Sequence, residues 1–327
     1  MNSSLTSASN ISRLSPAKIN LFLHITGRRA DGYHNLQTVF RLLDWGDYLH
    51  FSVAEAPVIQ TAKTEIDANT LCHQLLILAG AESITADIED NLIFKAARAL
   101  LAFAIQSDTL PKQLVQVAIT LDKHLPMGAG LGGGSSNAAT TMLALNEIWQ
   151  LNFTCDELLT IGAQVGADVP IFIFGQDAIA MGIGEKLTDI DLPDQQYLLL
   201  TPNAHVNTAT LFAHTKLKRD IVPISINTIQ SQYTDYVQTL TASYNNVFMP
   251  IVTSLAPAVA EALHYLQGLE AQAMSTARMT GSGSAVFLPL DASIASDKKL
   301  LAKWIKEAPC TGYVVGSFKN NISDYRA

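Results

Sequence analysis

The chain has little of what marks secreted, membrane-bound or zinc-binding proteins. Its three cysteines, Cys72, Cys155 and Cys310, lie far apart and are odd in number, so they predict neither a disulfide framework nor a zinc site. Residues 1–10 lack the basic start and the apolar core of a signal peptide. The longest apolar runs, such as residues 75–81, are too short to span a bilayer. We therefore expect a protein of the reducing cytoplasm with no membrane partner.

Positive charge is also scarce, and two common phosphate-binding motifs are missing. The formal net charge is −8, which argues against nonspecific nucleic-acid binding, and a polyphosphate site must gather its positive field locally. The sequence contains no G-x-x-x-x-G-K-S/T loop and none of the H-R-D and D-F-G signatures of protein kinases. Its 327 residues and hydrophobic content of 48% are enough for a substantial core and suggest two domains.

Glycine, by contrast, is concentrated at residues 125–137, which read Leu-Pro-Met-Gly-Ala-Gly-Leu-Gly-Gly-Gly-Ser-Ser-Asn. An alanine-rich segment with helical spacing follows at residues 138–149. Ser135, Ser136 and Asn137 are favourable N-cap residues, so the glycines are predicted to lead directly into a helix N-terminus. Unpaired backbone N–H groups beside the positive end of a helix dipole bind phosphate well. The pattern therefore predicts a phosphate-binding loop.

Two other interpretations of this loop stay open at the level of the sequence. It can be a flexible turn before a capped helix, or the G-x-G-x-x-G fingerprint of a dinucleotide-binding fold, matched by Gly128, Gly130 and Gly133. That fingerprint normally follows the first strand of its domain, whereas a long segment precedes it here. Glu147 and Asp156, the best-placed downstream acids, lie inside or just after the predicted helix. A nucleotide phosphate site is the favoured interpretation.

A second motif starts in a predicted strand at residues 13–26. Strict alternation gives this strand two faces, one with Ala17, Ile19, Leu21 and Leu23 and the other with Lys18, Asn20, Phe22 and His24. Lys18 is unusual inside an apolar strand because an unpaired ammonium is costly to bury. The alternative is a lysine on a solvated face. The turn that follows, residues 27–35, is rich in hydrogen-bond donors and belongs either to a binding site or to an ordinary polar hairpin loop.

A third motif holds an isolated carboxylate. Thr154 and Glu157 form a capping box at the start of a helix that is predicted to end at Gly166. Asp168 is then the only charged residue in the apolar run 166–174. Two roles are open for it: the N-cap of the next short element, or a catalytic base held in a partly dry pocket.

The second half of the chain predicts an α+β domain. Its expected elements are strands at 196–202 and 205–212, a helical region at 246–269, strands at 276–280 and 284–290, a helix at 293–307 and a strand at 312–318. Strands and helices in this order suggest a split βαβ sandwich. The join between the two domains is expected near residues 183–193, where a glycine turn precedes an Asp-rich connector.

Together the motifs resemble those of a known family. Pro-Ala-Lys-Ile-Asn-Leu at 16–21, Pro-Met-Gly-Ala-Gly-Leu-Gly-Gly-Gly-Ser-Ser-Asn at 126–137 and Thr-Gly-Ser-Gly-Ser at 280–284 resemble the three motifs of the GHMP small-molecule kinases. Gly-Arg-Arg-Ala-Asp-Gly-Tyr-His at 27–34 and Gly-Ala-Asp-Val-Pro at 166–170 resemble the branch that acts on a cytidine diphosphate-linked methylerythritol. The resemblance covers nearly the whole chain.

The resemblance implies a two-domain α+β GHMP kinase fold with the active site in the cleft between the domains. Residues 1–185 would form the N-terminal ATP-binding domain, and residues 186–327 a C-terminal, ferredoxin-like split βαβ domain that binds substrate. One departure is the connection at 54–89, which looks longer than the family's usual one. The chain would be a monomer or a weak homodimer and would bind no nucleic acid.

The implied reaction is transfer of the ATP γ-phosphoryl group to a tertiary hydroxyl in a pathway to isoprenoid precursors, with ATP and Mg²⁺ as cofactors. Asp168 resembles the catalytic base, and Lys18 the partner that keeps it ionised. The hydroxyl of either Ser135 or Ser136 would lie near Mg²⁺. No acidic residue can be assigned as a metal ligand. The residues implied in ATP binding are Lys123, Pro126, Met127, Gly128, Ala129, Gly130, Leu131, Gly132, Gly133, Gly134, Ser135 and Ser136.

The same resemblance assigns a substrate site. Tyr33 and His34 would contact the cytosine ring, and Phe212 would cover its opposite face, although plain core packing is the alternative for Phe212. The remaining substrate-binding residues would be Asn20, Asp168, Thr208, Gly281 and Ser282. Two other functions stay open: another small-molecule GHMP kinase, or a relative that binds ligand without turnover. The presence of both Lys18 and Asp168 favours an enzyme.

Overall fold

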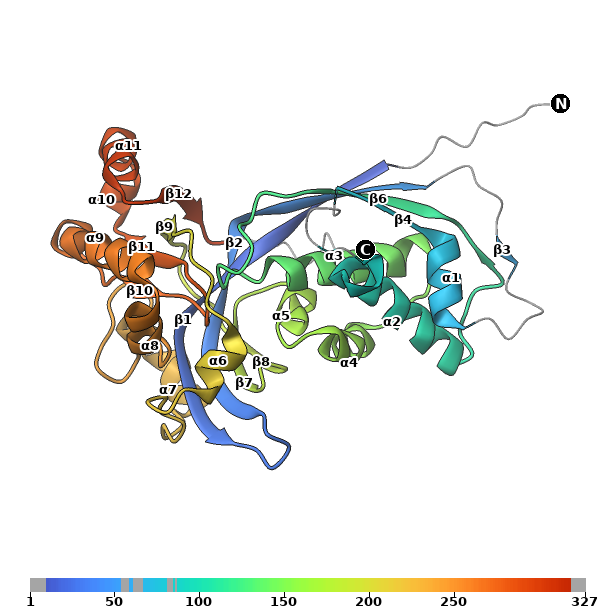
Figure 1. Ribbon diagram of the computed structural model, residues 1–327, viewed down its shortest axis with the longest axis horizontal. Helices are drawn as coiled ribbons and strands as arrows, with labels where there is room; N and C mark the ends of the chain where they lie inside the picture. The colour runs from blue at the N-terminus through green and yellow to red at the C-terminus, as the bar shows by residue number, and fades with distance from the viewer. Residues whose placement is uncertain (1–9, 54–58, 61–66, 81–84, 86, 319–327) are drawn as a thin grey trace.

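The computed structural model of the chain describes residues 10–53, 59–60, 67–80, 85 and 87–318. The prediction about a signal peptide in residues 1–10 lies almost entirely outside these ranges, and so does part of the connection 54–89. Figure 1 shows an elongated molecule in which two parts, each with its own sheet, lie side by side along the strands β1 and β2. In the part of the chain that is described, no helix has the length and apolar character that crossing a membrane requires.

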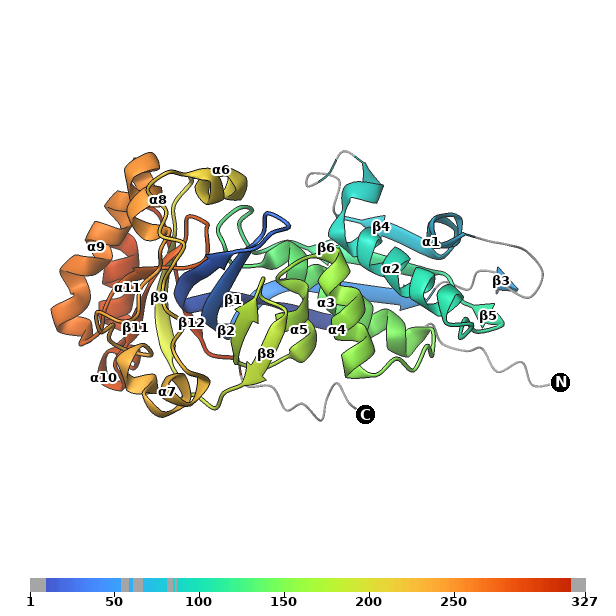
Figure 2. The same cartoon turned by 90° about the horizontal axis from the view of Figure 1, so that it is seen from below.

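The first part is a six-stranded sheet covered on one face by helices (Figures 1 and 2). Its strands are β1 (Asn10–Arg28), β2 (His34–Val53), β4 (Leu76–Ala79), β6 (Val117–Asp122), β7 (Ala178–Gly182) and β8 (Lys186–Asp189). They run in the order β4-β6-β2-β7-β8, with β1 paired to β2, and only β4 and β6 are parallel among these described pairs. The helices are α1 (Ala68–Leu75), α2 (Leu92–Gln106), α3 (Gly133–Ile148), α4 (Cys155–Val165) and α5 (Val169–Phe174).

Smaller elements complete this part. The short strands β3 (Ile59–Gln60) and β5 (Gln113–Leu114) pair with one another, and the 3₁₀ turn η1 (Ile88–Asp90) leads into α2. Helix α2 buries Phe94, Ala97 and Leu101, which recur at helical spacing and pack into the core under the sheet. This apolar stripe fixes α2, and with it the position of η1, against the sheet.

The second part is a four-stranded antiparallel sheet in the order β10-β11-β9-β12. Its elements are β9 (Gln196–Thr201), α6 (Thr208–Ala213), α7 (Ile226–Ser231), η2 (Tyr233–Asp235), α8 (Met249–Leu255), α9 (Pro257–Ala273), β10 (Arg278–Met279), β11 (Val286–Leu290), α10 (Ala292–Ala295), α11 (Lys298–Glu307) and β12 (Thr311–Gly316). In β9, Leu198 and Leu200 pack in the core that includes α9 and α11, whereas Tyr197 and Leu199 pack in the core that includes Ile19 of β1. Because the two faces of β9 pack in different cores, this strand joins the two parts of the molecule.

The α+β two-domain fold class is confirmed, and two details of the sequence prediction change. The strand expected at 205–212 is wrong, because the Asn207 side chain accepts a hydrogen bond from Thr210 N at 3.2 Å and caps helix α6 instead. A boundary between residues 185 and 186 would cut the hairpin of β7 and β8, since β8 pairs with β7 in the first sheet. By sheet membership, the first part extends to Asp189.

Candidate active site

The glycine-rich loop ends in a helix N-terminus, as predicted, but no side chain caps it. Helix α3 starts at Gly133, and its N-cap, Gly132, has a left-handed backbone with φ of 76° and makes no side-chain capping bond. The predicted N-caps Ser135, Ser136 and Asn137 all lie inside the helix instead, because the left-handed Gly132 turns the chain into the helix earlier. Gly128 and Gly130 are also left-handed. The backbone N–H groups at this helix end are thus left without a side-chain cap.

A pocket of about 280 Å³ lies along this loop. Its lining contains every residue from Pro126 to Gly134 together with Lys123, as expected for a phosphate-binding loop. The two predicted serines lie elsewhere. Ser136 is fully buried and accepts a hydrogen bond from Ser15 Oγ at 2.8 Å, whereas Ser135 lines a second pocket. Only Ser135 is therefore placed to contact a ligand.

The start of the loop is held by Asp47, a buried residue that the sequence reasoning missed. Its carboxylate accepts hydrogen bonds from the backbone N–H groups of His124 and Leu125 at 2.8 and 2.7 Å. It also accepts from Lys123 Nζ at 2.7 Å and from Asn137 Nδ2 at 3.1 Å. Four donors on one fully buried carboxylate fix both ends of the loop. Asp47 lies within the long strand β2, where its sequence neighbours gave no signal of this role.

A second pocket, of about 720 Å³, collects the predicted catalytic and substrate-binding residues. These are Lys18, Asn20, Tyr33, His34, Ser135, Asp168, Thr208, Phe212, Gly281 and Ser282. They come from β1, the turn before β2, the first residue of β2, α3, the segment before α5, α6 and the turn after β10. Both parts of the molecule therefore contribute to one pocket. Arg28 also lines it, and the donor-rich turn at 27–35 was the signal for it.

Lys18 and Asp168 form an ion pair in this pocket. Lys18 Nζ lies 3.3 Å from Asp168 Oδ2, with side chains 4% and 36% exposed. Lys18 Nζ also donates to Asn20 Oδ1 at 2.9 Å and lies 5.1 Å from the centre of the Phe40 ring. Asp168 occupies the N-cap position of α5, but its side chain makes no capping hydrogen bond. The Asp168 side chain therefore does not act as an N-cap.

The predicted faces of β1 change partway along the strand. A register shift between Asn20 and Leu23 puts Leu23 and Ile25 in the pocket with Lys18 and Asn20. The alternation had assigned His24 to this face, and that assignment is wrong. The His24 ring instead packs 5.0 Å from the Phe22 ring, and burial lowers its pKa to about 4. His24 is therefore a neutral core residue at ordinary pH.

Aromatic rings line the outer end of the pocket. The rings of His34 and Phe212 are stacked with centroids 5.0 Å apart and planes inclined by 25°, and Phe248 packs edge-on against Phe212. Tyr33 beside them is 63% exposed. Burial, followed by the charges of Arg219 and Arg28, lowers the pKa of His34, which favours a neutral ring with one donor and one acceptor nitrogen.

The glycine turn at 281–283 packs backbone to backbone against the phosphate-binding loop. A Cβ on Gly283 would come within 2.2 Å of Gly130 N, and Ala285 N donates to Ala129 O at 3.0 Å. Ser282 Oγ is also 2.9 Å from Thr208 Oγ1. The turn therefore ties the second sheet to the loop, and its residues Gly281 and Ser282 line the second pocket.

The fold, with an uncapped glycine loop beside a pocket that contains a Lys–Asp pair, defines a small-molecule kinase of the GHMP type. Residues 91–176, which include the loop and Asp168, match the family described as GHMP kinases N terminal domain. A mevalonate kinase from Methanococcus jannaschii shares the fold, with a TM-score of 0.63 at 13% identity over 96% of this chain and 100% of its own.

Curated relatives narrow the class. The 4-diphosphocytidyl-2-C-methyl-D-erythritol kinase of Psychrobacter arcticus is 73% identical over 97% of this chain and 100% of its own length. That of Acinetobacter baylyi is 41% identical over 94% and 95%. A crystal structure of 4-(cytidine 5'-diphospho)-2C-methyl-D-erythritol kinase matches with a TM-score of 0.69 at 26% identity, over 94% of this chain and 100% of that one. The chain belongs to the 4-diphosphocytidyl-2-C-methyl-D-erythritol kinase family, so the dinucleotide-binding interpretation of the glycine loop is wrong.

Proposed function

We propose that the chain transfers the γ-phosphoryl group of ATP to the 2-hydroxyl of 4-diphosphocytidyl-2-C-methyl-D-erythritol, in the methylerythritol phosphate route to isoprenoid precursors. The observation that carries the proposal is the Lys18–Asp168 pair, 3.3 Å apart, in a pocket that adjoins the phosphate-binding loop. A pair at that point can activate a hydroxyl for attack on a phosphoryl group held by the loop.

Asp168 is the base in this mechanism. A tertiary alcohol is a poor nucleophile, so a positioned carboxylate has to accept its proton as attack on the γ-phosphorus develops. Lys18 lies against Asp168, with Nζ 3.3 Å from Oδ2. The lysine offsets negative charge that spreads over the moving phosphoryl group. Asn20, which accepts from Lys18 Nζ at 2.9 Å, aims the ammonium toward Asp168.

The loop from Pro126 to Ser136 holds the ATP phosphates in this proposal. Three left-handed glycines at 128, 130 and 132 and the uncapped start of α3 leave backbone N–H groups to bind an anion. Lys123, already paired with Asp47, adds positive charge at the edge of the pocket. A cradle made mainly of backbone N–H groups agrees with the absence of a G-x-x-x-x-G-K-S/T loop from the sequence.

Mg²⁺ fits the residues on the substrate side of the loop. This ion usually keeps several waters and binds through one or two carboxylates plus substrate phosphates, so a rich protein ligand set is not required. Within the described ranges, no cluster of three or more His, Cys, Asp or Glu residues could hold a metal on its own. Of the two predicted serines, Ser135 would hold the ion, because the Ser136 hydroxyl is buried against Ser15. When bound, Mg²⁺ neutralises charge on the β- and γ-phosphates.

Substrate recognition uses the outer end of the same pocket. Tyr33 and Phe212 offer ring faces for the cytosine, and the neutral His34 offers an edge with one donor and one acceptor. Because the His34 and Phe212 rings are only 5.0 Å apart, a base can enter between ring faces only if one of them moves. Thr208, Asn20, Gly281 and Ser282 complete the contacts around the rest of the substrate.

The organisation that we propose follows from these assignments. The nucleotide-binding domain comprises residues 1–185, extended to Asp189 by the pairing of β8, and the substrate-binding domain comprises the rest of 186–327. The enzyme acts in the cytoplasm on a small molecule, without nucleic acid, as a monomer or a weak homodimer.

A panel assay tests the proposal. ADP release is measured with Mg²⁺-ATP and, in turn, 4-diphosphocytidyl-2-C-methyl-D-erythritol, mevalonate, homoserine and galactose. Only the diphosphocytidyl compound should support turnover. Equal or faster turnover of another alcohol would overturn the substrate assignment and leave a kinase of the same superfamily. Binding of the diphosphocytidyl compound without turnover of any panel member would indicate a relative that only binds ligand.

A further inference from the structure

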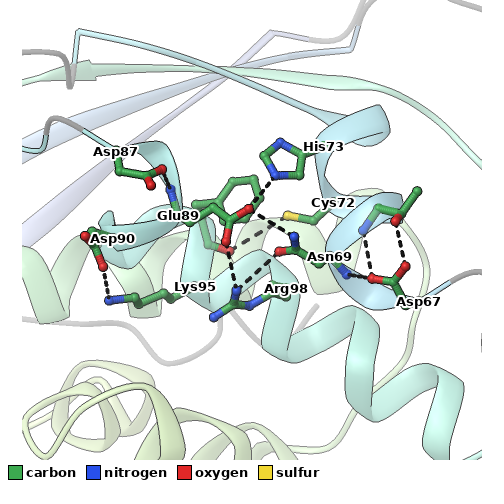
Figure 3. A network of polar contacts seen from close by, with 11 residues as sticks. Asp67, Asn69, Cys72, His73, Asp87, Glu89, Asp90, Lys95 and Arg98 are labelled. Carbon is green, nitrogen blue, oxygen red and sulfur yellow. Dashed lines mark hydrogen bonds and ion pairs between the residues drawn. The ribbon is translucent and has the colours of Figure 1, made fainter.

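A polar network outside both pockets connects three separate elements of the first part (Figure 3). Glu89 in η1 accepts a hydrogen bond from Asn69 Nδ2 at 3.0 Å, and the same oxygen, Oε1, lies 2.9 Å from His73 Nε2; both partners are on α1. The other oxygen of Glu89 lies 3.7 Å from Arg98 NH1 on α2, which also donates to Asn69 Oδ1 at 3.2 Å. The four side chains therefore link α1, η1 and α2 through one carboxylate.

The turn that Glu89 anchors leads directly into the wall of the nucleotide pocket. Asp90, Asn91 and Leu92, the three residues after Glu89, line that pocket opposite the glycine loop. Leu92 also lies close to the first turn of α3, since a Cβ on Gly134 would meet Leu92 Cδ1 at 3.1 Å. A shift of η1 would therefore displace both this wall of the pocket and the start of α3.

Besides Glu89, η1 is held by its continuity with α2, by Ile88, which packs against the core of the first part, and by Asp90, whose Oδ1 lies 3.3 Å from Lys95 Nζ on α2 (Figure 3). The element η1 is a 3₁₀ turn of three residues, a geometry with weak hydrogen bonds of its own, and none of its side chains is buried. Asp87 accepts from Glu89 N at 2.9 Å, but this bond lies within the turn and does not tie it to a neighbour. Hydrogen bonds from Asn69 and His73, with the charge of Arg98, lower the pKa of Glu89, so its carboxylate is ionised when it holds these partners.

The helix on the other side of the network is itself firmly placed. Leu71, Cys72 and Leu75 of α1 are buried in the core shared with α2, and the His73 ring packs 4.7 Å from the Phe94 ring. Helix α1 is part of the connection at 54–89 that looked longer than usual in the sequence, and nothing in the reaction itself uses it. It supplies two of the three partners of Glu89.

We infer that Glu89 is a positioning residue for the nucleotide: with Asn69 and His73 of α1 it holds η1 so that Asp90, Asn91 and Leu92 form the wall of the ATP pocket. The inference rests on the proposed use of ATP but not on the identity of the phosphate acceptor. Because the network lies on the ATP side only, its loss acts on nucleotide affinity and leaves the Lys18–Asp168 chemistry unchanged.

The test compares Glu89→Ala with a matched control, Glu157→Ala. Glu157 is also a glutamate in the first turn of a short helical element, where it completes the capping box of α4, but it lines neither pocket. The dissociation constant of ATP is measured by calorimetry without a second substrate, and kinetics then separate KM from kcat. Glu89→Ala should weaken ATP binding about 3- to 10-fold, a scale typical of one link in a packed network. The kcat at saturating ATP and the KM of the acceptor should stay within about twofold of wild type.

Two further variants separate positioning from plain stability. Glu89→Gln keeps an acceptor for Asn69 and should recover most of the ATP affinity. The double variant Asn69→Ala/Glu89→Ala should bind ATP as Glu89→Ala does, because both changes break the same link. Should Glu89→Ala fail to fold, Asn69→Ala tests that link with a weakening of about two- to threefold.

Unchanged ATP affinity in folded Glu89→Ala would overturn the inference, as would an equal loss of affinity in Glu157→Ala. These outcomes are distinct from failure of the proposed function. If wild-type protein bound ATP but phosphorylated none of the panel compounds, the substrate assignment would fail while the calorimetric comparison of Glu89→Ala still decided the inference.

Discussion

Replacing Asp168 by asparagine should leave the protein folded and almost abolish turnover. Asparagine keeps the size and shape of the side chain but cannot accept the substrate proton. Loss of a general base lowers kcat by roughly 10²–10⁴, and KM for either substrate should change by about threefold at most. Lys18→Met should act mainly on kcat as well, since the ammonium serves the same step.

The structure also sets the expected effect on stability. The Asp168 side chain is 36% exposed and makes no capping bond to α5, and Lys18 Nζ keeps its hydrogen bond to Asn20 Oδ1. The free energy of unfolding of Asp168→Asn should therefore differ from wild type by about 1 kcal/mol or less, the scale of an ion pair that is open to solvent.

Two measurements check the prediction for Asp168. A coupled assay of ADP release gives kcat and both KM values, and urea unfolding gives the stability. Asp156→Asn is the matched control, because Asp156 is an exposed carboxylate in the first turn of α4 and lines neither pocket. Turnover of Asp168→Asn within tenfold of wild type would refute the role of base. A clear loss of stability with kcat retained would make Asp168 a structural partner of Lys18.

Three further predictions follow from other parts of the site. Tyr33→Ala and Phe212→Ala should each raise KM for the cytidine substrate about 5- to 150-fold, because stacking on one ring face contributes about 1–3 kcal/mol. The KM for ATP should stay unchanged. An effect on the KM for ATP alone would mean that the two pockets are assigned the wrong way round. Gly283→Ala should lower kcat/KM for both substrates by about tenfold or more, because its Cβ would come within 2.2 Å of Gly130 N. The control Gly268→Ala in α9 should have no kinetic effect, because no atom lies within 4 Å of its Cβ. Equal kcat/KM values in the two variants would contradict the close packing at Gly283. Burial lowers the pKa of His24 from 6.5 to about 4, so between these pH values the folded protein binds fewer protons than the unfolded chain, and stability falls as the pH falls. In urea unfolding, the free energy of unfolding of wild type should fall by about 3 kcal/mol more than that of His24→Gln between pH 7 and pH 4. Parallel curves of stability against pH for the two proteins would exclude the effect.

Local sequence patterns predicted the elements and several of their junctions. The helical spacing of α3, the capping box of Thr154 and Glu157 and the apolar run of β9 each depend on neighbours in the chain, so they can be predicted without tertiary structure. The glycine loop before α3 was predicted for the same reason, because left-handed backbone and a helix start are local properties. The prediction was wrong where a side chain offered a competing local bond, as Asn207 does at the start of α6.

Other features required the register between strands and the packing of distant segments. Alternation alone put His24 beside Asn20, but the register shift in β1 exchanged it for Leu23 and Ile25. A bulge inserts a residue without a strong sequence signal, and every later side chain then changes face.

The functional residues show the same division. The sequence by itself determined that a lysine, an isolated aspartate and a glycine loop were present, because each stands out against its own neighbours. Only the tertiary structure decided that Lys18 and Asp168 meet at 3.3 Å, that Ser136 is buried while Ser135 faces the pocket, and that Asp47 fixes the loop. Those outcomes depend on contacts between residues far apart in the chain, where burial and hydrogen-bond geometry, rather than local propensity, decide which groups come together.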